Sequence, residues 1–280
     1  MQLMPASPLV SIVVSTFNQG QYLPRALDSV MFQSYANIEI IICNFGSTDG
    51  TSEIIHTYVS KEIDEEVSYL ERLADTNGNA DYVRKYEKRF WHNRKLKVLE
   101  DPKNIGGTNS YNRGFKAAEG KYCTYLVADD YLLPDAIAAM VQTLEETAAD
   151  VVYSDLFVVN DHGRILQYLR KPDYSFKACF ADWFHLGVSR LYRRELHEAV
   201  GYYDPAYINA NDYDMFLRFA MHGASFVHIP SVHYCTRKHD PANPAEPASW
   251  RNNGYENLID ESTRCARRAK RFLSERKGVA

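Results

Sequence analysis

The chain has 280 residues, of which 45% are apolar and 24% are charged, with a net charge of -4, so it has the composition of an ordinary globular protein and enough material for one large domain. The negative net charge argues against a general nucleic-acid-binding protein, and we expect neither a signal peptide nor a membrane span, since no apolar run approaches about 18 residues. The five cysteines are scattered, with no C-x-x-C pair, which is typical of reduced thiols in a cytoplasmic protein.

The first half of the chain alternates between strand-like and helix-like segments. Compact β-branched runs predict buried strands, and apolar residues at helical spacing predict the helices between them. The expected strands are 9–15, 38–43, 98–99 and 122–127, and the expected helices are 22–34, 51–58 and 111–118. Strand, helix and strand in this order indicate a parallel sheet with right-handed crossovers.

One charged segment, residues 61–97, interrupts this alternation. Its apolar residues fall into two groups on either side of the turn-like residues 76–79. We expect two amphipathic helices around that turn. They could form a lid, a subunit contact such as that of a homodimer, or a plain surface insertion.

The second half of the chain is less regular. Helical and strand-like patterns continue, and Asn160–Gly163 has the composition of a hairpin turn. The expected elements are a helix over 135–147, a strand over 151–154, a hairpin of 157–159 with 165–166, the short segments 178–183 and 188–192, helices over 194–200 and 210–220, and a strand over 226–229. From Ser262 the tail carries seven Lys and Arg residues with apolar residues at helical spacing. This pattern predicts a basic amphipathic helix, either packed on the domain or lying on an anionic membrane surface.

Two adjacent acids, Asp129 and Asp130, follow the apolar strand 122–127 directly. Ligands of open α/β sheets bind at the carboxyl ends of strands, so this edge is where a charged ligand is expected. Two neighbouring carboxylates repel each other unless a cation lies near them, and Mg²⁺ or Mn²⁺ is often held by one or two carboxylates and the phosphates of a substrate. The alternative is a simple turn ahead of Pro134, where Asp is common.

Two further stretches add polar groups. Asp101–Ser110 is a Gly- and Asn-rich loop that opens a helix, and such a loop can bind phosphate through its backbone amides, although it is not a Walker loop. Asp212 lies in the first turn of an apolar helix, where an acid also satisfies backbone N–H groups.

A series of motifs in fixed order is more specific than any one of these stretches. The motifs are Pro8–Asn18, Ser29–Gln33, Glu39–Thr51, Asn104-x-Gly106, Ala128–Asp130, Gly201–Asp204 and Asn211–Arg218. In this order, over roughly residues 8–240, the chain closely resembles the family 2 glycosyltransferases. The resemblance implies the GT-A fold, a Rossmann-like α/β architecture in which a mixed, mainly parallel sheet is flanked by helices in a single large domain.

The resemblance also implies a division of labour along the chain. Residues 8–130 would bind the nucleotide sugar, residues 131–240 would bind the acceptor and carry the catalytic base, and residues 241–280 would form a C-terminal loop and a basic helical tail. In the acceptor half, Trp183, His185 and Tyr207 are candidates for a binding groove.

Roles for single residues follow from the same resemblance. Asp212 would be the general base of an inverting enzyme, Asp130 would coordinate Mn²⁺ or Mg²⁺ on the diphosphate, and His239 would lie near the metal or the phosphates. The residues expected to bind the nucleotide sugar are Thr16, Phe17, Asn18, Asn44, Phe45, Ser47, Asn104, Gly106, Asn112 and Asp129. Displacement of a nucleoside diphosphate needs a cation for the leaving phosphate and a base for the acceptor hydroxyl. The expected partners are therefore a nucleotide-sugar donor and a glycan or other hydroxyl acceptor.

Three positions depart from the family pattern. Asn44-Phe45 replaces an acidic pair whose second acid contacts uracil, so a UDP donor is in doubt, although Asn44 could pair with a base and Phe45 could stack on one. Tyr111 stands where an arginine is common, and Asn211 replaces the glutamate before the base. These departures leave open a degenerate, non-catalytic nucleotide- or sugar-binding module. A sugar nucleotidyltransferase is disfavoured because residues 16–20 lack its basic signature loop.

Overall fold

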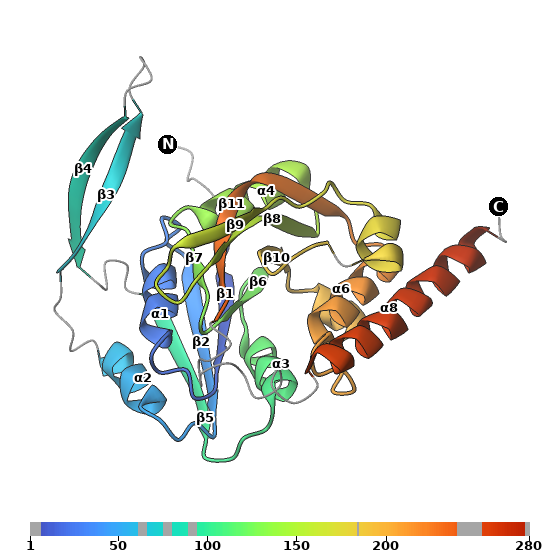
Figure 1. Cartoon of the computed structure of the whole chain (residues 1–280), viewed down its shortest axis with the longest axis horizontal. Helices are drawn as coiled ribbons and strands as arrows, with labels where there is room; N and C mark the ends of the chain where they lie inside the picture. Colours follow the sequence, from blue (N-terminus) through green and yellow to red (C-terminus); the bar gives the residue numbers. More distant parts are fainter. Residues whose placement is uncertain are drawn as a thin grey trace.

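A mixed sheet of nine strands runs through the part of the chain that the computed structural model describes, residues 7–60, 66–74, 80–88, 94–183, 185–239 and 254–277 (Figure 1). The strand order is β5-β2-β1-β6-β10-β8-β11-β7, and β9 pairs with β8. The sheet extends through both the expected donor half and the expected acceptor half. The prediction of one domain with a mixed, mainly parallel sheet flanked by helices is confirmed.

The first four strands of this order are parallel to one another, as the sequence predicts. They are β5 (Lys95–Asp101), β2 (Ile38–Phe45), β1 (Val10–Thr16) and β6 (Tyr122–Val127). The helices between them are α1 (Leu23–Met31), α2 (Thr51–Ser60) and α3 (Gly107–Ala117). Because the four strands point the same way, their carboxyl ends meet at one edge of the sheet.

The second half of the chain continues the sheet with antiparallel pairings. Strand β10 (Arg190–Arg193) is antiparallel to both β6 and β8 (Val151–Val159), while β11 (Phe226–Arg237) is parallel to β8. The remaining elements are β7 (Tyr131–Leu132), β9 (Ile165–Leu169), α4 (Ala136–Thr147), the π-helix η1 (Lys177–Asp182), α5 (Leu196–Val200), α6 (Asn211–His222) and α8 (Gly254–Lys277). The expected hairpin is confirmed, since β8 and β9 are antiparallel.

Strand β11 is longer than the sequence predicts. Its pairing with β8 shifts between Ile229 and Val232 and again before Tyr234. The irregularity begins beside Pro230, which has no N–H group for a regular ladder, so the strand continues through a bulge that a periodicity argument cannot anticipate. The extension carries the chain from the core to Arg237, next to the carboxyl end of β6.

The two faces of the sheet are buried by different helices. On β1 and β2, one set of alternate residues, including Val13 and Ile41, packs in a cluster with α3, α6 and α8, whereas Ile12 and Ile40 pack in a cluster with α1 and α4. Successive side chains of a strand point to opposite faces, so continuous apolar runs are buried on both sides.

The prediction for residues 61–97 was wrong in its secondary structure. In place of two helices, β3 (Glu66–Ala74) and β4 (Ala80–Lys88) form an antiparallel hairpin, which projects from the rest of the chain in Figure 1. Val67, Tyr69, Tyr82 and Tyr86 favour strands, and the register places Glu66 opposite Lys88. The expected turn at 76–79 lies outside the described residues.

The basic tail forms the long helix α8, which lies against α6 and η1 (Figure 1). Its buried side includes Glu261, Cys265 and Ala269. Among the helices of the described ranges, none combines the length and apolar character needed to cross a membrane. A contact of this tail with a membrane surface stays a prediction.

Candidate functional site

At the carboxyl edge of the sheet, hydrogen bonds from side chains join the loop after β1 to the loop after β2. The backbone N–H of Asn18, after β1, donates to Ser47 Oγ at 3.0 Å, and Asn18 Oδ1 accepts from the Thr48 N–H at 2.7 Å. Asn18 has a φ of 52°, a left-handed conformation that Asn adopts more readily than most residues. The predicted donor-binding residues Asn18 and Ser47 thus lie together. Thr16 ends β1 beneath them, almost fully buried.

Asp129 lies just beyond the end of β6 and faces His239. Its Oδ2 atom is 2.8 Å from His239 Nε2, while His239 Nδ1 is 2.7 Å from Asp161 Oδ1. Hydrogen bonding to Asp129 and to Asp161 raises the pKa of His239, although burial opposes the shift. The ring also lies 4.9 Å from that of Tyr22, centroid to centroid. Residues 110 positions apart in the sequence therefore meet here.

The other oxygen of Asp129 differs from Oδ2 in its surroundings. Asp129 Oδ1 is buried and has no hydrogen-bond donor among the described residues. Nowhere among the described residues do three His, Cys, Asp or Glu side chains come together to form a metal site made of protein ligands alone. Mg²⁺ and Mn²⁺ do not require such a cage when substrate phosphates complete their coordination. Asp129 therefore offers one oxygen to a divalent cation, whereas both ring nitrogens of His239 are engaged by carboxylates.

Asp130, the predicted metal ligand, points into the protein instead. Its Oδ2 atom accepts from the Tyr234 hydroxyl at 2.9 Å and its Oδ1 atom from the Arg237 N–H at 2.7 Å. Burial, together with the charge of Asp129, raises the pKa of Asp130 to about 8. These bonds join β6 to β11, so Asp130 fixes the position of the chain that leads to His239.

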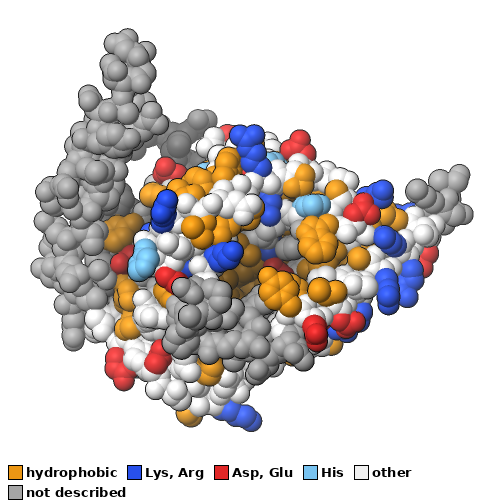
Figure 2. Space-filling model, viewed as in Figure 1, with side chains coloured by type: hydrophobic (Ala, Val, Ile, Leu, Met, Phe, Trp, Pro, Cys, Tyr) orange, Lys and Arg blue, Asp and Glu red, His pale blue; other side chains and the backbone are white. Residues whose placement is uncertain are grey.

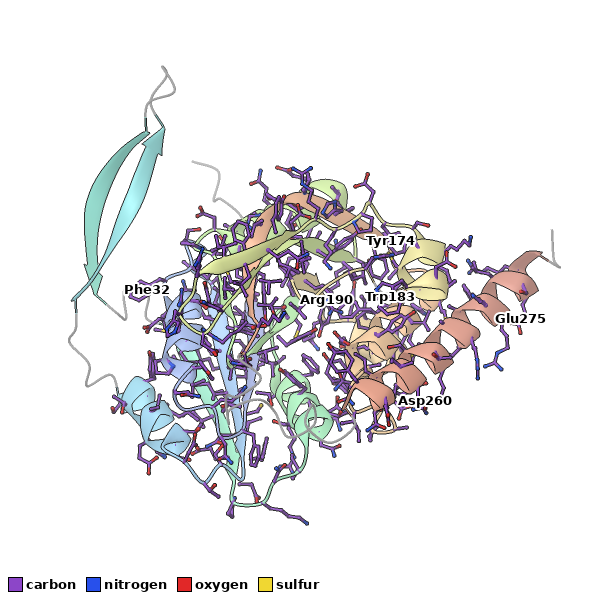
Figure 3. All side chains as sticks on the ribbon, in the orientation of Figure 1. Phe32, Tyr174, Trp183, Arg190, Asp260 and Glu275 are labelled. Carbon is purple, nitrogen blue, oxygen red and sulfur yellow. The ribbon has the colours of Figure 1, made fainter. Side chains whose placement is uncertain are left out.

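Asp212, the predicted base, lies at the start of α6 opposite β6. Its Oδ2 atom accepts from Arg190 at 2.6 Å and from the Tyr125 hydroxyl at 3.0 Å. The Arg190 side chain is fully buried, whereas that of Asp212 is 19% exposed. Figure 3 shows Arg190 near the middle of the molecule. Each carboxylate oxygen can accept more than one hydrogen bond, so Asp212 is held in place and can still be reached.

Strand β6 connects these two groups of residues. Tyr125 holds Asp212, and Asp129 follows Tyr125 by four positions. An extended chain of this length spans no more than about 14 Å. The predicted metal-binding and proton-accepting sides therefore lie within the span of one nucleotide sugar.

The positions that depart from the family pattern have structural partners. Tyr111 packs edge-on against Tyr125 and Tyr203, with ring centroids 5.4 and 5.8 Å apart. Asn112, expected near the nucleotide, exchanges hydrogen bonds of 2.8 and 2.9 Å with the backbone of Tyr203. Asn211 donates to Thr108 at 2.9 Å. All three side chains thus join α3 to the second half of the chain or to strand β6, which contacts the predicted base Asp212.

Asn44 and Phe45 are both buried, at 3% exposure. Asn44 donates to Ser52 and to Glu100, each at 2.8 Å, and Phe45 packs in the core beside Val13. Stacking of Phe45 on a base would require the ring to leave this core. Phe17, which directly follows β1, has an exposed ring, at 43%.

The predicted phosphate loop has the backbone geometry of a tight turn. Asn104 Oδ1 accepts from the Gly106 N–H at 2.8 Å, and Gly106, with a φ of 79°, precedes the first residue of α3. A Cβ atom on Gly46 would lie 2.5 Å from the Asn104 N atom, so this loop and the β2 loop approach each other closely. The N-terminus of α3 therefore faces the same edge as Asn18 and Ser47.

The three acceptor-groove candidates differ in accessibility. Trp183 is 67% exposed and follows η1. Within η1, the Phe180 carbonyl accepts from the hydroxyl of Tyr213, the residue after Asp212 in the sequence, at 2.5 Å. On the face of the molecule that Figure 2 shows, hydrophobic side chains gather over the middle, with Lys and Arg side chains between them. Burial and the charge of Lys171 lower the pKa of His185. Tyr207 is only 8% exposed, with the Arg264 guanidinium 4.9 Å above its ring.

Several residues of the site carry no signal in a single sequence. Arg190 lies on a short strand, Asp161 in a hairpin turn and Arg237 in the extension of β11. Arg237 donates to the Asp129 carbonyl at 2.8 Å and stacks over Tyr22 at 4.8 Å. Only the fold brings them to the two acids.

Comparison with known sequences identifies the family of the chain. A model described as "Glycosyl transferase family 2" matches residues 11–73 and 74–201. The chain is 28% identical over 233 residues to a chondroitin synthase of Pasteurella multocida, covering 81% of this chain and 20% of that protein. It is 25% identical over 169 residues to the glycosyltransferase GlyG of Streptococcus pneumoniae, covering 60% of this chain and 46% of that protein. The chain spans a fifth of the length of the synthase.

Solved structures with the same fold have bound donors. Residues 1–349 of S. aureus TarS in complex with UDP-GlcNAc have a TM-score of 0.66 and 18% identity, over 95% of this chain and 71% of that one. The mannosyltransferase PcManGT of Pyrobaculum calidifontis, in complex with GDP-Man and Mn²⁺, has a TM-score of 0.58 and 16% identity, over 91% and 63%. At these identities the likeness shows the fold.

Proposed function

The chain belongs to glycosyl transferase family 2, and from this premise we propose that it transfers a hexose-type sugar, with inversion, from a nucleoside diphosphate to a hydroxyl group of an acceptor. The observation that carries the proposal is the placement of Asp129 with His239 and of Asp212 with Arg190 along one strand, β6. A GT-A protein with a similar fold has been solved with a nucleotide sugar and Mn²⁺. The proposal therefore includes a divalent cation.

On the donor side we assign the cation to Asp129, not to Asp130, with His239 holding the Asp129 carboxylate in place. Asp129 has a buried oxygen without a donor among the described residues, whereas both oxygens of Asp130 are engaged by Tyr234 and Arg237. A bound Mn²⁺ or Mg²⁺ would stabilise negative charge on the leaving diphosphate. Asp161 orients the His239 ring by binding its Nδ1 atom, so that Nε2 faces Asp129.

On the acceptor side Asp212 accepts the proton of the attacking hydroxyl. Its carboxylate is held by Arg190 and Tyr125 through Oδ2, while Oδ1 accepts from the Tyr213 N–H at 2.6 Å. A single base that activates the acceptor on the face opposite the leaving group produces inversion. Arg190 and Tyr125 fix the direction of this carboxylate, and the partial exposure of Asp212 gives the hydroxyl access to it.

We place the sugar acceptor on the surface that includes Trp183. The exposed indole of Trp183 offers a flat apolar face, and η1 is fastened next to Asp212 through the bond between Phe180 and Tyr213. Relatives that match 81% of this chain are synthases of chondroitin and hyaluronan. We propose a glycan or glycoconjugate acceptor, with Trp183 beneath one of its rings.

The first test is donor binding and turnover. Sugar nucleotides of UDP, GDP, dTDP, CDP and ADP would be titrated against the protein with Mn²⁺ and with EDTA, and nucleotide release would be measured for each that binds. We expect Mn²⁺-dependent binding of one nucleotide class and slow hydrolysis of its sugar. Binding without any hydrolysis or transfer would support a degenerate binding module instead, a reading that the buried Asn44 and Phe45 would then explain.

A further inference from the structure

The turn that leads into α6 is held by hydrogen bonds to a residue of another helix. Ala210, at the N-cap position of α6, has no side chain that could accept a hydrogen bond. Glu261 of α8 binds the backbone just before the helix, because its carboxylate accepts from the N–H groups of Ile208 at 3.0 Å, Asn209 at 2.9 Å and Ala210 at 2.7 Å. Three successive backbone donors thus converge on one side chain that lies 51 residues beyond Ala210 in the sequence.

This carboxylate is itself buried, with Glu261 at 4% exposure. A buried acid is costly unless it is hydrogen-bonded, and backbone N–H groups at a helix N-terminus favour a negative charge. A nearby bond of 3.1 Å from Asn209 Nδ2 to the Gly254 carbonyl holds the first turn of α8 to the same backbone. Glu261 therefore has a specific, fully hydrogen-bonded position.

A second contact anchors α8 on the other side of Asp212. Arg268 donates to Asp214 Oδ1 at 2.5 Å, and Arg218 donates to Asp214 Oδ2 at 2.8 Å. Asp214 is completely buried, so these contacts define the first turn of α6 from within. Asp212 lies between Ala210 and Asp214, and α8 thus holds the backbone both before and after the proposed base.

We infer that Glu261 is a positioning residue for catalysis and that α8, through Glu261 and Arg268, sets the location of the Asp212 carboxylate. The inference rests on the proposed function of Asp212. A displacement of about 1 Å in a reacting group can reduce the rate about 10²-fold. The donor-side residues Asp129 and His239 lie at the ends of β6 and β11, and their described contacts include none with α8. Removal of the Glu261 carboxylate should consequently slow transfer without weakening donor binding.

The test substitutes Glu261→Gln, which keeps the size of the side chain but removes its charge and leaves one acceptor oxygen for the three N–H donors. Glu275→Gln, at an exposed position near the other end of α8 (Figure 3), is the matched control. We expect E261Q to lower kcat by about 10²-fold, with the donor Kd in the presence of Mn²⁺ unchanged, and E275Q to resemble the wild type. A lower thermal midpoint with an unchanged kcat for folded E261Q would overturn the inference.

A double-mutant cycle separates positioning from a general loss of structure. If Glu261 acts through Asp212, E261Q should cause little further loss of transfer in an Asp212→Asn background, because residues that act as a unit are not additive. Equal losses in both backgrounds would contradict the inference. If E261Q fails to fold, Glu261→Asp and Arg268→Lys carry the same comparison. Donor binding without transfer by the wild type would refute the proposed function itself, so the two failures are distinguishable.

Discussion

The exchange of roles between Asp129 and Asp130 can be tested by two isosteric substitutions. Asp129→Asn removes the carboxylate that faces His239 and replaces one of its oxygens with an amide. Asp130→Asn leaves an oxygen for the Arg237 N–H and presents an amide to the Tyr234 hydroxyl, which can accept as well as donate. We therefore expect Asp129→Asn to lose metal-dependent donor binding and Asp130→Asn to retain it.

The size of the effect follows from linkage. A donor present at about 100 times its Kd stabilises the folded state by about 2.7 kcal/mol. For 280 residues, an unfolding entropy of about 2.1 cal/mol/K per residue gives roughly 0.6 kcal/mol/K, so the midpoint should rise by about 5 °C. Asp129→Asn should abolish this rise, and Asp130→Asn should preserve it.

Thermal unfolding with the donor, in Mn²⁺ and in EDTA, measures both variants against the wild type. Free protein of each variant, scanned alone, controls for changes in intrinsic stability. The opposite pattern, with the rise kept by Asp129→Asn and lost by Asp130→Asn, would refute the reasoning and restore Asp130 as the metal ligand.

Three further predictions concern pH, packing and the acceptor. Because the pKa of Asp130 is raised to about 8, the folded state holds a proton that the unfolded state has released, so in EDTA the stability of the wild type should fall between about pH 4 and pH 8. Asp130→Asn should flatten this dependence in midpoints measured across that range, and an unchanged slope would contradict the assignment. A Cβ atom at Gly114 would lie 2.3 Å from Val13 Cγ1 and 2.9 Å from Cys43 Sγ, so Gly114→Ala should destabilise the fold by about 1–3 kcal/mol in denaturant titrations; no loss would show that α3 can move away from the sheet. Trp183→Ala should raise the acceptor KM without changing donor affinity, and an unchanged acceptor KM would remove Trp183 from the acceptor site.

Much of the fold follows from patterns that a single sequence contains. The buried strands β1, β2 and β6 are compact apolar runs, and they end at polar residues that the parallel arrangement brings to one edge. The local signal failed in the hairpin β3–β4, where charges mask the alternation, and in β11, where Pro230 interrupts it. In both places pairing with a neighbouring strand decides the conformation, and periodicity within one segment does not record that pairing.

The candidate site was predictable to a smaller extent. Asp129 and Asp212 stand in motifs and His239 at a position that the resemblance indicates, whereas Arg190 and Glu261 carry no such signal. The importance of Arg190 comes from its bond to Asp212, and that of Glu261 from three N–H groups about 50 residues away in the chain. The adjacent acids Asp129 and Asp130 are difficult for a different reason. Neighbouring residues of an extended chain point to opposite sides, so an error of one residue exchanges the acid that faces the ligand with the acid that faces the core. The sequence predicts the pair, and the contacts of each carboxylate distinguish its members.

The central claim is that Asp212 is the base of a glycosyl transfer whose donor binds elsewhere. The most direct measurement is the rate of sugar transfer by Asp212→Asn, under conditions where Mn²⁺-dependent donor binding by the same protein is confirmed. The amide can still accept from Arg190 through its oxygen but cannot take a proton. We expect donor affinity like that of the wild type and loss of transfer, whereas transfer at the wild-type rate would contradict the account.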